Sequence, residues 1–378
     1  MDELEVLDRF ARTHLSTEAE LAVYLTLDHR RPGFLSADEV AQIAGYPVAE
    51  IEPAVARSKK YFGNDLFADR RPQLYGLITE KFENTPLARV FDEPVRPNEA
   101  VRQIAAVQVS APGAPEDILA AALAEVREAQ FKHYADLLVF AEHFLFDRDW
   151  IAGNVEKAAS FSARALAELT ALAAELKVWL LPHLVERDGA RYYSTVYLLS
   201  PEGVQGKYRA THLWDREREW ATPGDDLPVF RAPFGNVGVM VGYEGMMPEV
   251  ARSLALGGAD LVAWPTAWRS PAEYQYVAHE RAMENRVVIV AANRQDSPAP
   301  GPSLLIQPAG YPQNTLASDL AHGVRGFVTR FVALCACRVK RETNNTDLLL
   351  HRRPELYGNI TGERHEHSHR ETRSRRLA

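Results

Sequence analysis

Short apolar segments alternate with longer amphipathic segments from residue 101 onward, and this alternation limits the possible folds more than any other feature. The apolar segments are typical of buried strands and lie at 104–109, 137–140, 178–184, 191–199, 237–241, 261–264 and 287–292. Helical periodicity occurs at 117–134, 158–176 and 248–257. Strands that alternate with helices predict a layered α/β domain.

Size, composition and charge narrow the class of protein further. A chain of 378 residues has room for two or three domains. The hydrophobic fraction of 46% and the charged fraction of 25% are those of folded proteins, which excludes a disordered or collagen-like chain. Lys and Arg number 43 against 51 Asp and Glu, so the net charge is −8 and the chain as a whole does not attract nucleic acid strongly.

The cysteines and the N-terminus bear on the expected compartment. Cys335 and Cys337 are separated by one residue, which is neither a disulfide framework nor a zinc-ligand spacing. The N-terminal residues are acidic and lack an apolar signal core. No run of about 18 apolar residues predicts a membrane span. We therefore expect a cytoplasmic protein without a membrane partner.

Several motifs of the α/β region follow one another in a characteristic order. They lie at 106–108, 135–142, 206–213, 222–224, 234–244, 247–252, 258–260, 281–285 and 352–357. In residues and order they resemble the carbon–nitrogen hydrolase, or nitrilase, superfamily. The resemblance implies a four-layer αββα sandwich in a domain of residues 100–363. It also implies a homodimer that forms through helices.

The resemblance further implies a catalytic site of three residues. In the family, a glutamate is the general base, a lysine stabilises the oxyanion, and a cysteine attacks a nitrile or amide carbon. Glu142 matches the base, and Glu217 matches a second family glutamate. The lysine position is Ala210, because Lys207 belongs to the preceding Gly-Lys pair, and the nucleophile position is Gly242. Without a thiol no thioester can form, so covalent amidase or nitrilase activity is not expected.

Other side chains are candidates for a ligand site around Glu142. The candidates are His143, His212, Tyr243, Glu244 and Trp268. Loss of the lysine and cysteine side chains should leave room for a small ligand among them. Glu142 is either a structural residue in a buried hydrogen-bond network or a carboxylate available as a base. No tight metal-ligand spacing is present, so neither a metal nor another cofactor is predicted.

Residues 1–95 have a different character and are predicted to form a separate domain. Helical segments at 18–27, 35–45 and 48–61, followed by a wing at 71–77, resemble the winged helix–turn–helix of sugar-responsive regulators. The third helix carries two acids and a proline where a DNA-reading helix carries Arg, Ser or Gln. Residues 1–95 contain 11 basic and 17 acidic residues, a net charge of −6. We therefore favour a protein-contacting or core-covering role over DNA binding. Three prolines at 85–98 predict a linker.

Two further features stand apart from the domains. The segment Asp-Arg-Arg-Pro-Gln-Leu-Tyr-Gly at 69–76 closely resembles His-Arg-Arg-Pro-Glu-Leu-Tyr-Gly at 351–358. Chance or shared local geometry accounts for this better than a repeat architecture does. The basic, histidine-rich stretch at 364–378 is predicted to be a solvated tail.

Three functions remain open from the sequence. The leading hypothesis is a nitrilase-fold protein that binds a small molecule without acyl-transfer chemistry. The first alternative is a repurposed enzyme that uses Glu142 as a general base in non-covalent chemistry on a small C–N compound. The second alternative is a ligand-responsive transcriptional regulator.

Overall fold

The computed structural model describes residues 60–61, 64–92, 101–110, 113–309, 314–343 and 345–362. All of these residues belong to one compact unit, Lys60–Ala378. The helices predicted for the winged-helix region before residue 60 and the tail predicted at 364–378 lie outside the described residues. No helix in the described part of the chain is long and apolar enough to cross a membrane.

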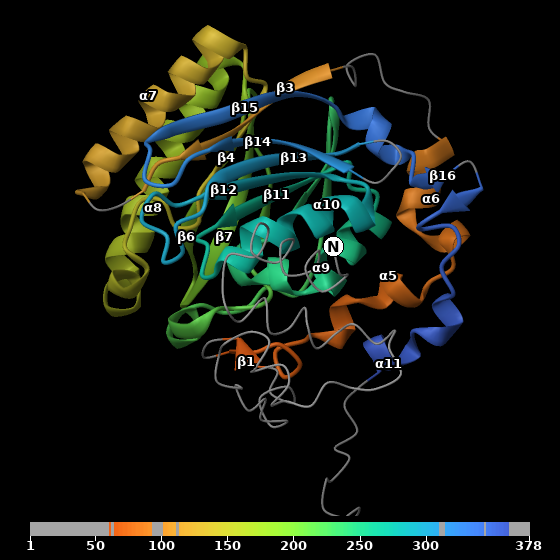
Figure 1. The fold of residues 1–378 in the computed structure, drawn as a ribbon. Helices are drawn as coiled ribbons and strands as arrows, with labels where there is room; N and C mark the ends of the chain where they lie inside the picture. The colour runs from red at the N-terminus through yellow and green to blue at the C-terminus, as the bar shows by residue number, and fades with distance from the viewer. Residues whose placement is uncertain are drawn as a thin grey trace, which may run out of the picture. The chain divides into compact units, whose positions relative to one another are not determined.

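Two mixed β-sheets form the centre of this unit (Figure 1). The first sheet has the order β14-β13-β12-β11-β10-β9, with bounds β9 Val229–Ala232, β10 Gly235–Val239, β11 Leu261–Thr266, β12 Val288–Asn293, β13 Ser303–Ala309 and β14 Asn314–Leu320. The second has the order β15-β3-β4-β5-β7-β6, with β8 paired to β7. Its bounds are β3 Val101–Gln108, β4 Leu137–Phe140, β5 Trp179–Leu181, β6 His183–Asp188, β7 Arg191–Ser200, β8 Gly203–Arg209 and β15 Gly326–Ala333.

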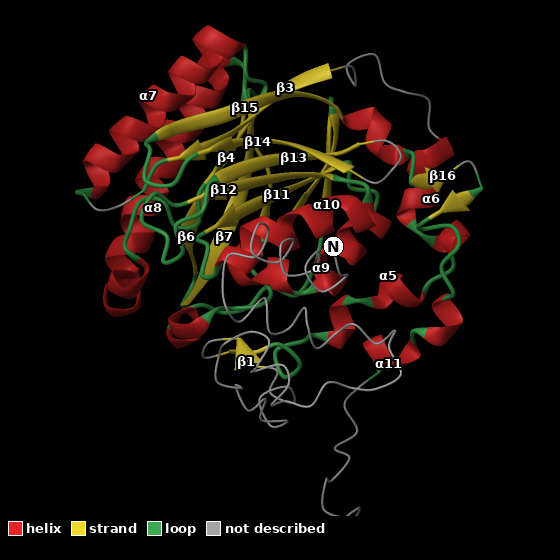
Figure 2. Cartoon of the chain, viewed as in Figure 1, coloured by secondary structure: helices red, strands yellow, loops and turns green. Residues whose placement is uncertain are grey.

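Two pairs of long helices cover the outer faces of the sheets (Figure 2). Helices α7 Pro115–His133 and α8 Arg148–Leu176 pack on the second sheet, and α9 Pro248–Leu256 and α10 Ala278–Asn285 pack on the first. One hydrophobic cluster fills the space between the sheets, and one lies under each helix pair. This arrangement confirms the predicted α/β sandwich with four αββα layers.

Helix α8 begins earlier than its apolar periodicity predicts. The Asp147 side chain accepts a hydrogen bond from the Trp150 amide and caps a first turn that lies about ten residues before the predicted start. Asn154 has non-helical backbone angles and separates this added part from the predicted part. The periodicity therefore identified only the straight portion of the helix.

Parallel pairing places several loops at one edge of the sandwich. In the first sheet β10 and β12 both run parallel to β11, and in the second sheet β3, β4 and β5 are parallel. Loops that follow the carboxyl ends of parallel strands gather at one edge, which is where α/β proteins build their sites. Glu142 follows β4, Gly242 follows β10, and Trp268 follows β11.

Residues 64–92 are largely helical. Two short strands, β1 Lys60–Tyr61 and β2 Asn64–Asp65, precede η1 Pro72–Leu74, α5 Gly76–Thr79, η2 Phe82–Asn84 and α6 Pro86–Asp92. The predictions of a β wing at 71–77 and of a linker at 85–98 are therefore wrong where the structure describes these residues. Tyr75, Ile78 and Leu87 are buried in the hydrophobic cluster under α9 and α10, and this burial stabilises helices too short to persist alone.

The two similar segments have the same structure and contact each other. After β16 Arg341–Thr343 and β17 Thr346–Asp347, the chain forms η7 Pro354–Leu356 and α11 Gly358–Thr361, which correspond to η1 and α5. Arg70 donates from Nη2 to the Ile360 carbonyl at 2.8 Å, and Arg352 donates from Nη2 to the Ile78 carbonyl. Such reciprocal contacts are those of a two-fold interface, here formed within one chain.

Candidate functional site

The predicted base and the predicted nucleophile position face each other. Gly242 begins η4 Gly242–Met246, directly after β10, with a φ of +44° that favours glycine. A Cβ atom at this position would lie 2.4 Å from Glu142 Oε2. The two positions taken from the family motifs therefore meet at one buried point. The space that a side chain at 242 would occupy is filled, which is contrary to the expected extra room there.

Arg269 lies beside both of these residues, and no sequence motif pointed to it. Its Nη2 lies 3.1 and 3.2 Å from the two carboxylate oxygens of Glu142, and 3.0 Å from the place of a Cβ at Gly242. The guanidinium also lies 4.6 Å from the centre of the Trp214 ring. Its Nε and Nη1 are buried and have no hydrogen-bond partner among the described residues. The only available signal was the position of Arg269 just after Trp268 at the end of β11.

The environment of Glu142 favours its ionised form. Burial raises the pKa of this carboxyl group, but the opposing effect of Arg269, with that of Arg148, His143 and Arg294, is larger and lowers the pKa below its ordinary value. Arg148 Nη1 lies 3.4 Å from Glu142 Oε1. Glu142 is therefore a carboxylate paired with a buried cation and has little tendency to accept a proton.

Glu217 is part of a separate buried network with two histidines. The side chain of His143 donates from Nε2 to Glu217 Oε1 at 2.9 Å, and the Ser194 hydroxyl donates to the same oxygen at 2.9 Å. The amide of His143 donates to Nδ1 of His183, so the His183 proton is on Nε2, which lies 2.8 Å from Ser194 Oγ. Burial, with His143 and Arg294, keeps the pKa of His183 well below its usual value. His143 directly follows Glu142 in the chain and its side chain bonds to Glu217, so it connects the two glutamates.

The turn that carries Glu142 and His143 is strained and is held by a buried arginine. His143 has a φ of +42°, which is uncommon for a residue with a Cβ. Arg294 Nη1 donates to the carbonyl groups of Glu142, His143 and Phe146, at 3.0, 2.6 and 3.0 Å. The turn therefore has its geometry imposed by the surrounding fold, as functional turns commonly do.

Glu244 and His212 are structural residues rather than open ligand contacts. Glu244 Oε1 accepts bonds from the Tyr208 hydroxyl at 2.6 Å and from the Thr211 amide at 2.7 Å. Its Oε2 accepts the Val241 amide at 2.7 Å. His212 Nε2 lies 2.7 Å from the Tyr75 hydroxyl. These bonds fix the loop after β8 against the turn after β10.

Aromatic side chains surround Arg269. The Tyr243 ring is stacked on Tyr61 at 6.4 Å and lies 5.1 Å from Trp214. The Tyr61 hydroxyl donates to Glu273 and lies 3.1 Å from Ser270 Oγ. Tyr61 therefore contacts both the turn after β10 and the segment after β11.

Trp268 is buried next to Arg269 in the chain and is held by two hydrogen bonds. It is fully buried, and its indole N–H donates to the Pro302 carbonyl at 2.7 Å. Its amide donates to Asn293 at 3.0 Å. With its polar atom bonded to the main chain, Trp268 offers only apolar surface.

Neither Lys207 nor a cysteine is placed where it could replace the missing groups. Lys207 Nζ lies 2.6 Å from Glu186, on a side chain that is 43% exposed. Cys337 is buried with Lys340 and Asp260, and burial raises its pKa to about 12. Asp260 precedes β11, whereas Thr266 at the other end of that strand contacts the Glu142 amide. Six residues of strand span about 20 Å, so Cys337 lies at the opposite edge.

The position predicted for the family lysine is buried and apolar. Ala210 is 2% exposed and belongs to the hydrophobic cluster between the two sheets. Its amide donates to the Ser194 carbonyl at 2.8 Å, and its carbonyl accepts the Gly224 amide at 2.9 Å. Both backbone polar groups of Ala210 are thus hydrogen-bonded, and its methyl side chain supplies no charge.

Comparison with known proteins agrees with the motifs and the fold. The carbon-nitrogen hydrolase family model matches residues 103–312, more than half of the chain. The chain belongs to this family. It is 38% identical over 124 residues to a nitrilase of Pyrococcus abyssi, covering 32% of this chain and 47% of that protein. It is 28% identical over 225 residues to deaminated glutathione amidase of Mus musculus, covering 52% and 66%.

A solved structure shows the same fold. An amidase from Nesterenkonia sp. matches with a TM-score of 0.59 and 24% identity, covering 70% of this chain and 98% of that chain. The chain spans 39% to 66% of the length of three relatives, from Schizosaccharomyces pombe, Pyrococcus abyssi and Mus musculus. Within the described residues, no group of three or more His, Cys, Asp or Glu side chains is arranged to hold a metal ion.

Proposed function

We propose that this carbon–nitrogen hydrolase homologue binds a small polar molecule in the Glu142–Arg269 site and does not carry out covalent amide or nitrile hydrolysis. The observation that carries the proposal is Gly242, which stands at the nucleophile position with the Glu142 carboxylate against it. A thioester needs a sulfur atom at that point, and no described thiol lies near it.

Unpaired polar atoms support binding at this site. Arg269 Nε and Nη1, Glu273 Oε2 and His143 Nδ1 are all buried without a hydrogen-bond partner among the described residues. Buried donors and acceptors without partners are costly, and a polar ligand or ordered water would satisfy them. A ligand with both donors and acceptors fits this set.

The alternative of an enzyme that uses Glu142 as a general base is less well supported. A general base works best with a pKa near the working pH. Arg269 instead holds the pKa of Glu142 low.

The alternative of a transcriptional regulator is also less well supported, because two arginines that could contact DNA phosphates are bonded within the chain. Arg70 is paired with Glu249 at 2.8 Å, and Arg71 donates to the Thr211 and Gly224 carbonyls. The implied homodimer remains part of our proposal and can be measured by sedimentation.

An activity panel with a covalent trap tests the proposal. The purified chain is incubated with aliphatic amides, nitriles and carbamoyl compounds, with the Nesterenkonia amidase as the active control. A variant of that amidase shows covalent addition of the acetamide group of fluoroacetamide at its active-site cysteine. We expect no ammonia release from this chain and no fluoroacetamide adduct in the peptide that contains Gly242. Turnover that the Glu142→Gln variant abolishes would show that the proposal is wrong.

A further inference from the structure

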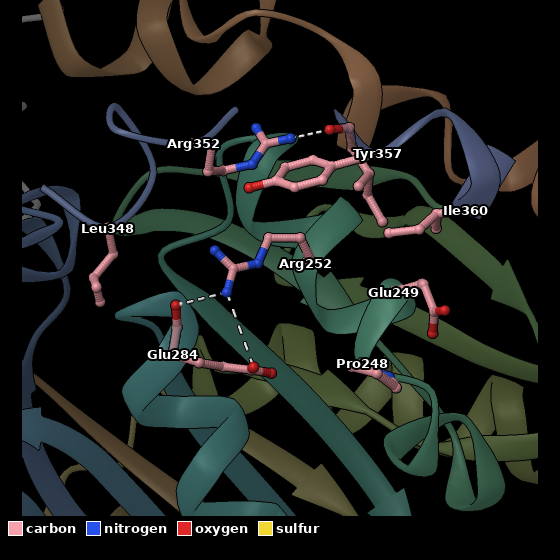
Figure 3. Close-up of a pocket in the computed structure, with 9 residues that line it drawn as sticks. Pro248, Glu249, Arg252, Glu284, Leu348, Arg352, Tyr357 and Ile360 are labelled. Atoms are coloured by element: carbon pink, nitrogen blue, oxygen red, sulfur yellow. Dashed lines mark hydrogen bonds and ion pairs between the residues drawn. The ribbon is translucent and has the colours of Figure 1, made fainter. Parts of the chain in front are cut away.

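A cavity lies between α9, α10 and residues 348–360, and it shares no residue with the Glu142–Arg269 site. Its volume is about 350 Å³. Ile78, Leu348 and Ile360 form an apolar part of its wall. Two arginines, Arg252 and Arg352, supply its positive charge (Figure 3). A cavity of this size with a largely apolar wall and a few polar groups is typical of small-molecule sites.

The internal repeat shows what Arg352 lacks. Arg70 is the equivalent residue of the first segment. Both arginines bind a helix carbonyl of the other segment, but Arg70 Nε also lies 2.8 Å from the carboxylate of Glu249. Arg352 has no carboxylate partner among the described residues, and its Nη1 is buried with no hydrogen-bond partner there. One half of a paired arrangement therefore holds an acid, and the other half does not.

The repeated tyrosines differ in the same way. The Tyr75 hydroxyl accepts the Arg71 amide at 3.1 Å and pairs with His212 at 2.7 Å. The Tyr357 hydroxyl accepts the Arg353 amide at 3.2 Å, and no described group takes its proton. Figure 3 shows the Tyr357 ring between the Arg352 and Arg252 side chains. The hydroxyl proton is thus a second donor at the cavity without an acceptor.

The acids that line the cavity pair with arginines other than Arg352. Glu249 pairs with Arg70, as described above. Glu284 Oε1 lies 2.8 Å from Arg281, whereas its Oε2 is 3.9 Å from Arg252. Arg252 instead donates to the Glu284 main-chain carbonyl at 2.9 Å. Burial and the nearby Arg252 lower the pKa of Arg352, as expected for a partly buried cation beside a second cation.

We propose that this cavity binds a small carboxylate with a compact apolar group, held by Arg352, Arg252 and the Tyr357 hydroxyl. The planar guanidinium group of Arg352 suits a carboxylate. In the equivalent place, Arg70 Nε lies 2.8 Å from the carboxylate of Glu249. The aliphatic side chains opposite the arginines accept the apolar group. The ligand supplies the acceptors that Arg352 Nη1 and the Tyr357 hydroxyl lack, and the carboxylate partner that Arg352 lacks.

Calorimetric titration of the full chain tests this site with benzoate as the probe and benzamide as its neutral control. We expect saturable binding of benzoate and none of benzamide. Arg352→Met should weaken benzoate binding about tenfold or more, because a charged hydrogen-bonded pair is lost. Arg353→Met is the matched control, since the exposed Arg353 side chain pairs with Glu355 and does not line the cavity. It should bind benzoate as the unmodified chain does.

A second variant separates loss of binding from loss of folding. Leu348→Trp fills the cavity and removes none of its charged groups, so it should abolish benzoate binding while the circular dichroism spectrum is unchanged. Benzoate affinity unaltered by both Arg352→Met and Leu348→Trp would overturn the proposal. Equal binding of benzamide, or binding of inorganic phosphate in place of benzoate, would also overturn it. Activity toward amides does not enter this test, so its outcome is independent of the function proposed above.

Discussion

At the scale of single residues, the site around Gly242 is closed by its own neighbours. The backbone there has a φ of +44°, and the Glu142 carboxylate and the Arg269 guanidinium fill the volume beside the Cα atom. A family nucleophile would need that volume. We conclude that the glycine and the buried ion pair depend on each other, because neither could be kept if position 242 carried a longer side chain.

Gly242→Ala should therefore destabilise the fold. A left-handed backbone with a Cβ and a forced shift of a buried ion pair together cost about 1–3 kcal/mol. The free energy of unfolding in urea measures the effect. Gly76→Ala is the matched control, because a Cβ at Gly76 would meet no atom within 4 Å. Equal stability of the Gly242→Ala variant and the unmodified chain would show that the site is more open than described.

The paired Glu142 carboxylate should make stability depend on acid pH. Its pKa is lower in the folded chain than in the unfolded chain, where the ordinary value is about 4.3. The unfolded chain therefore binds the proton first, and stability falls as the pH drops from about 5 through the folded pKa. Glu142→Gln removes this contribution, so its stability should fall less steeply over the same range. Urea unfolding between about pH 3 and pH 7 measures the slopes.

An exposed glutamate provides the control for that pH series. Glu156 lies on α8 with a side chain that is 77% exposed, 3.4 Å from Arg187. Surface pairs of this kind contribute little to stability. Glu156→Gln should follow the slope of the unmodified chain. A Glu142→Gln slope that matches both would contradict the pairing of Glu142 with Arg269.

At the scale of secondary-structure elements, the two Arg-Arg-Pro segments form the same pair of short helices with different surroundings. The match extends beyond the first eight residues to Ile78 and Thr79, which correspond to Ile360 and Thr361. Each threonine hydroxyl donates to the carbonyl of the first residue in its own helix. Closely similar local sequence therefore gives the same pair of short helices, and the main differences lie in what each copy contacts.

The same substitution should have unequal effects in the two copies. Tyr75→Phe leaves the buried His212 Nε2 and the Arg71 amide without a partner and should cost about 1–3 kcal/mol of unfolding free energy. Tyr357→Phe affects only the exposed Arg353 amide and should change stability by about 0.5 kcal/mol or less. Each variant is the control for the other in thermal unfolding. Equal losses would mean that the two copies are equivalent in energy as well as in shape.

At the scale of the whole molecule, residues 64–92 complete the core of the α/β domain. Tyr75, Ile78 and Leu87 are 0%, 5% and 1% exposed, and they pack in the cluster under α9 and α10. Burial of each such side chain stabilises the fold by about 1.5–3 kcal/mol. In the described structure, the folded domain therefore begins near residue 60.

Two truncations test this boundary. A chain that begins at residue 60 should unfold cooperatively, because Lys60–Ala378 is one compact unit. A chain that begins at residue 101 should lose at least about 4 kcal/mol, since three buried side chains are removed. Unfolding by urea, followed by tryptophan fluorescence, measures both. Similar stability of the two truncated chains would contradict a core role for residues 64–92.

The sequence by itself determined the α/β sandwich and the two facing positions of the site. Apolar patterning is local, so strands at 137–140 and 261–264 could be predicted without a partner in view, and the second extends to Thr266 in the structure. The family motifs placed Glu142 opposite Gly242 because their order along the chain carries the fold. Only the tertiary structure decided which side chain lies beside both of them. Arg269 is distant from both in sequence, and its role depends on where β11 ends relative to β4 and β10.

The regions 71–77 and 85–98 are places where an expectation from the sequence was overridden by tertiary packing. The winged-helix resemblance predicts a wing at 71–77, and three prolines predict a linker at 85–98. Burial of Tyr75, Ile78 and Leu87 against α9 stabilises short helices instead, and that burial depends on residues about 170 positions further along the chain. Local sequence sets which conformations are low in free energy, and long-range packing selects among them.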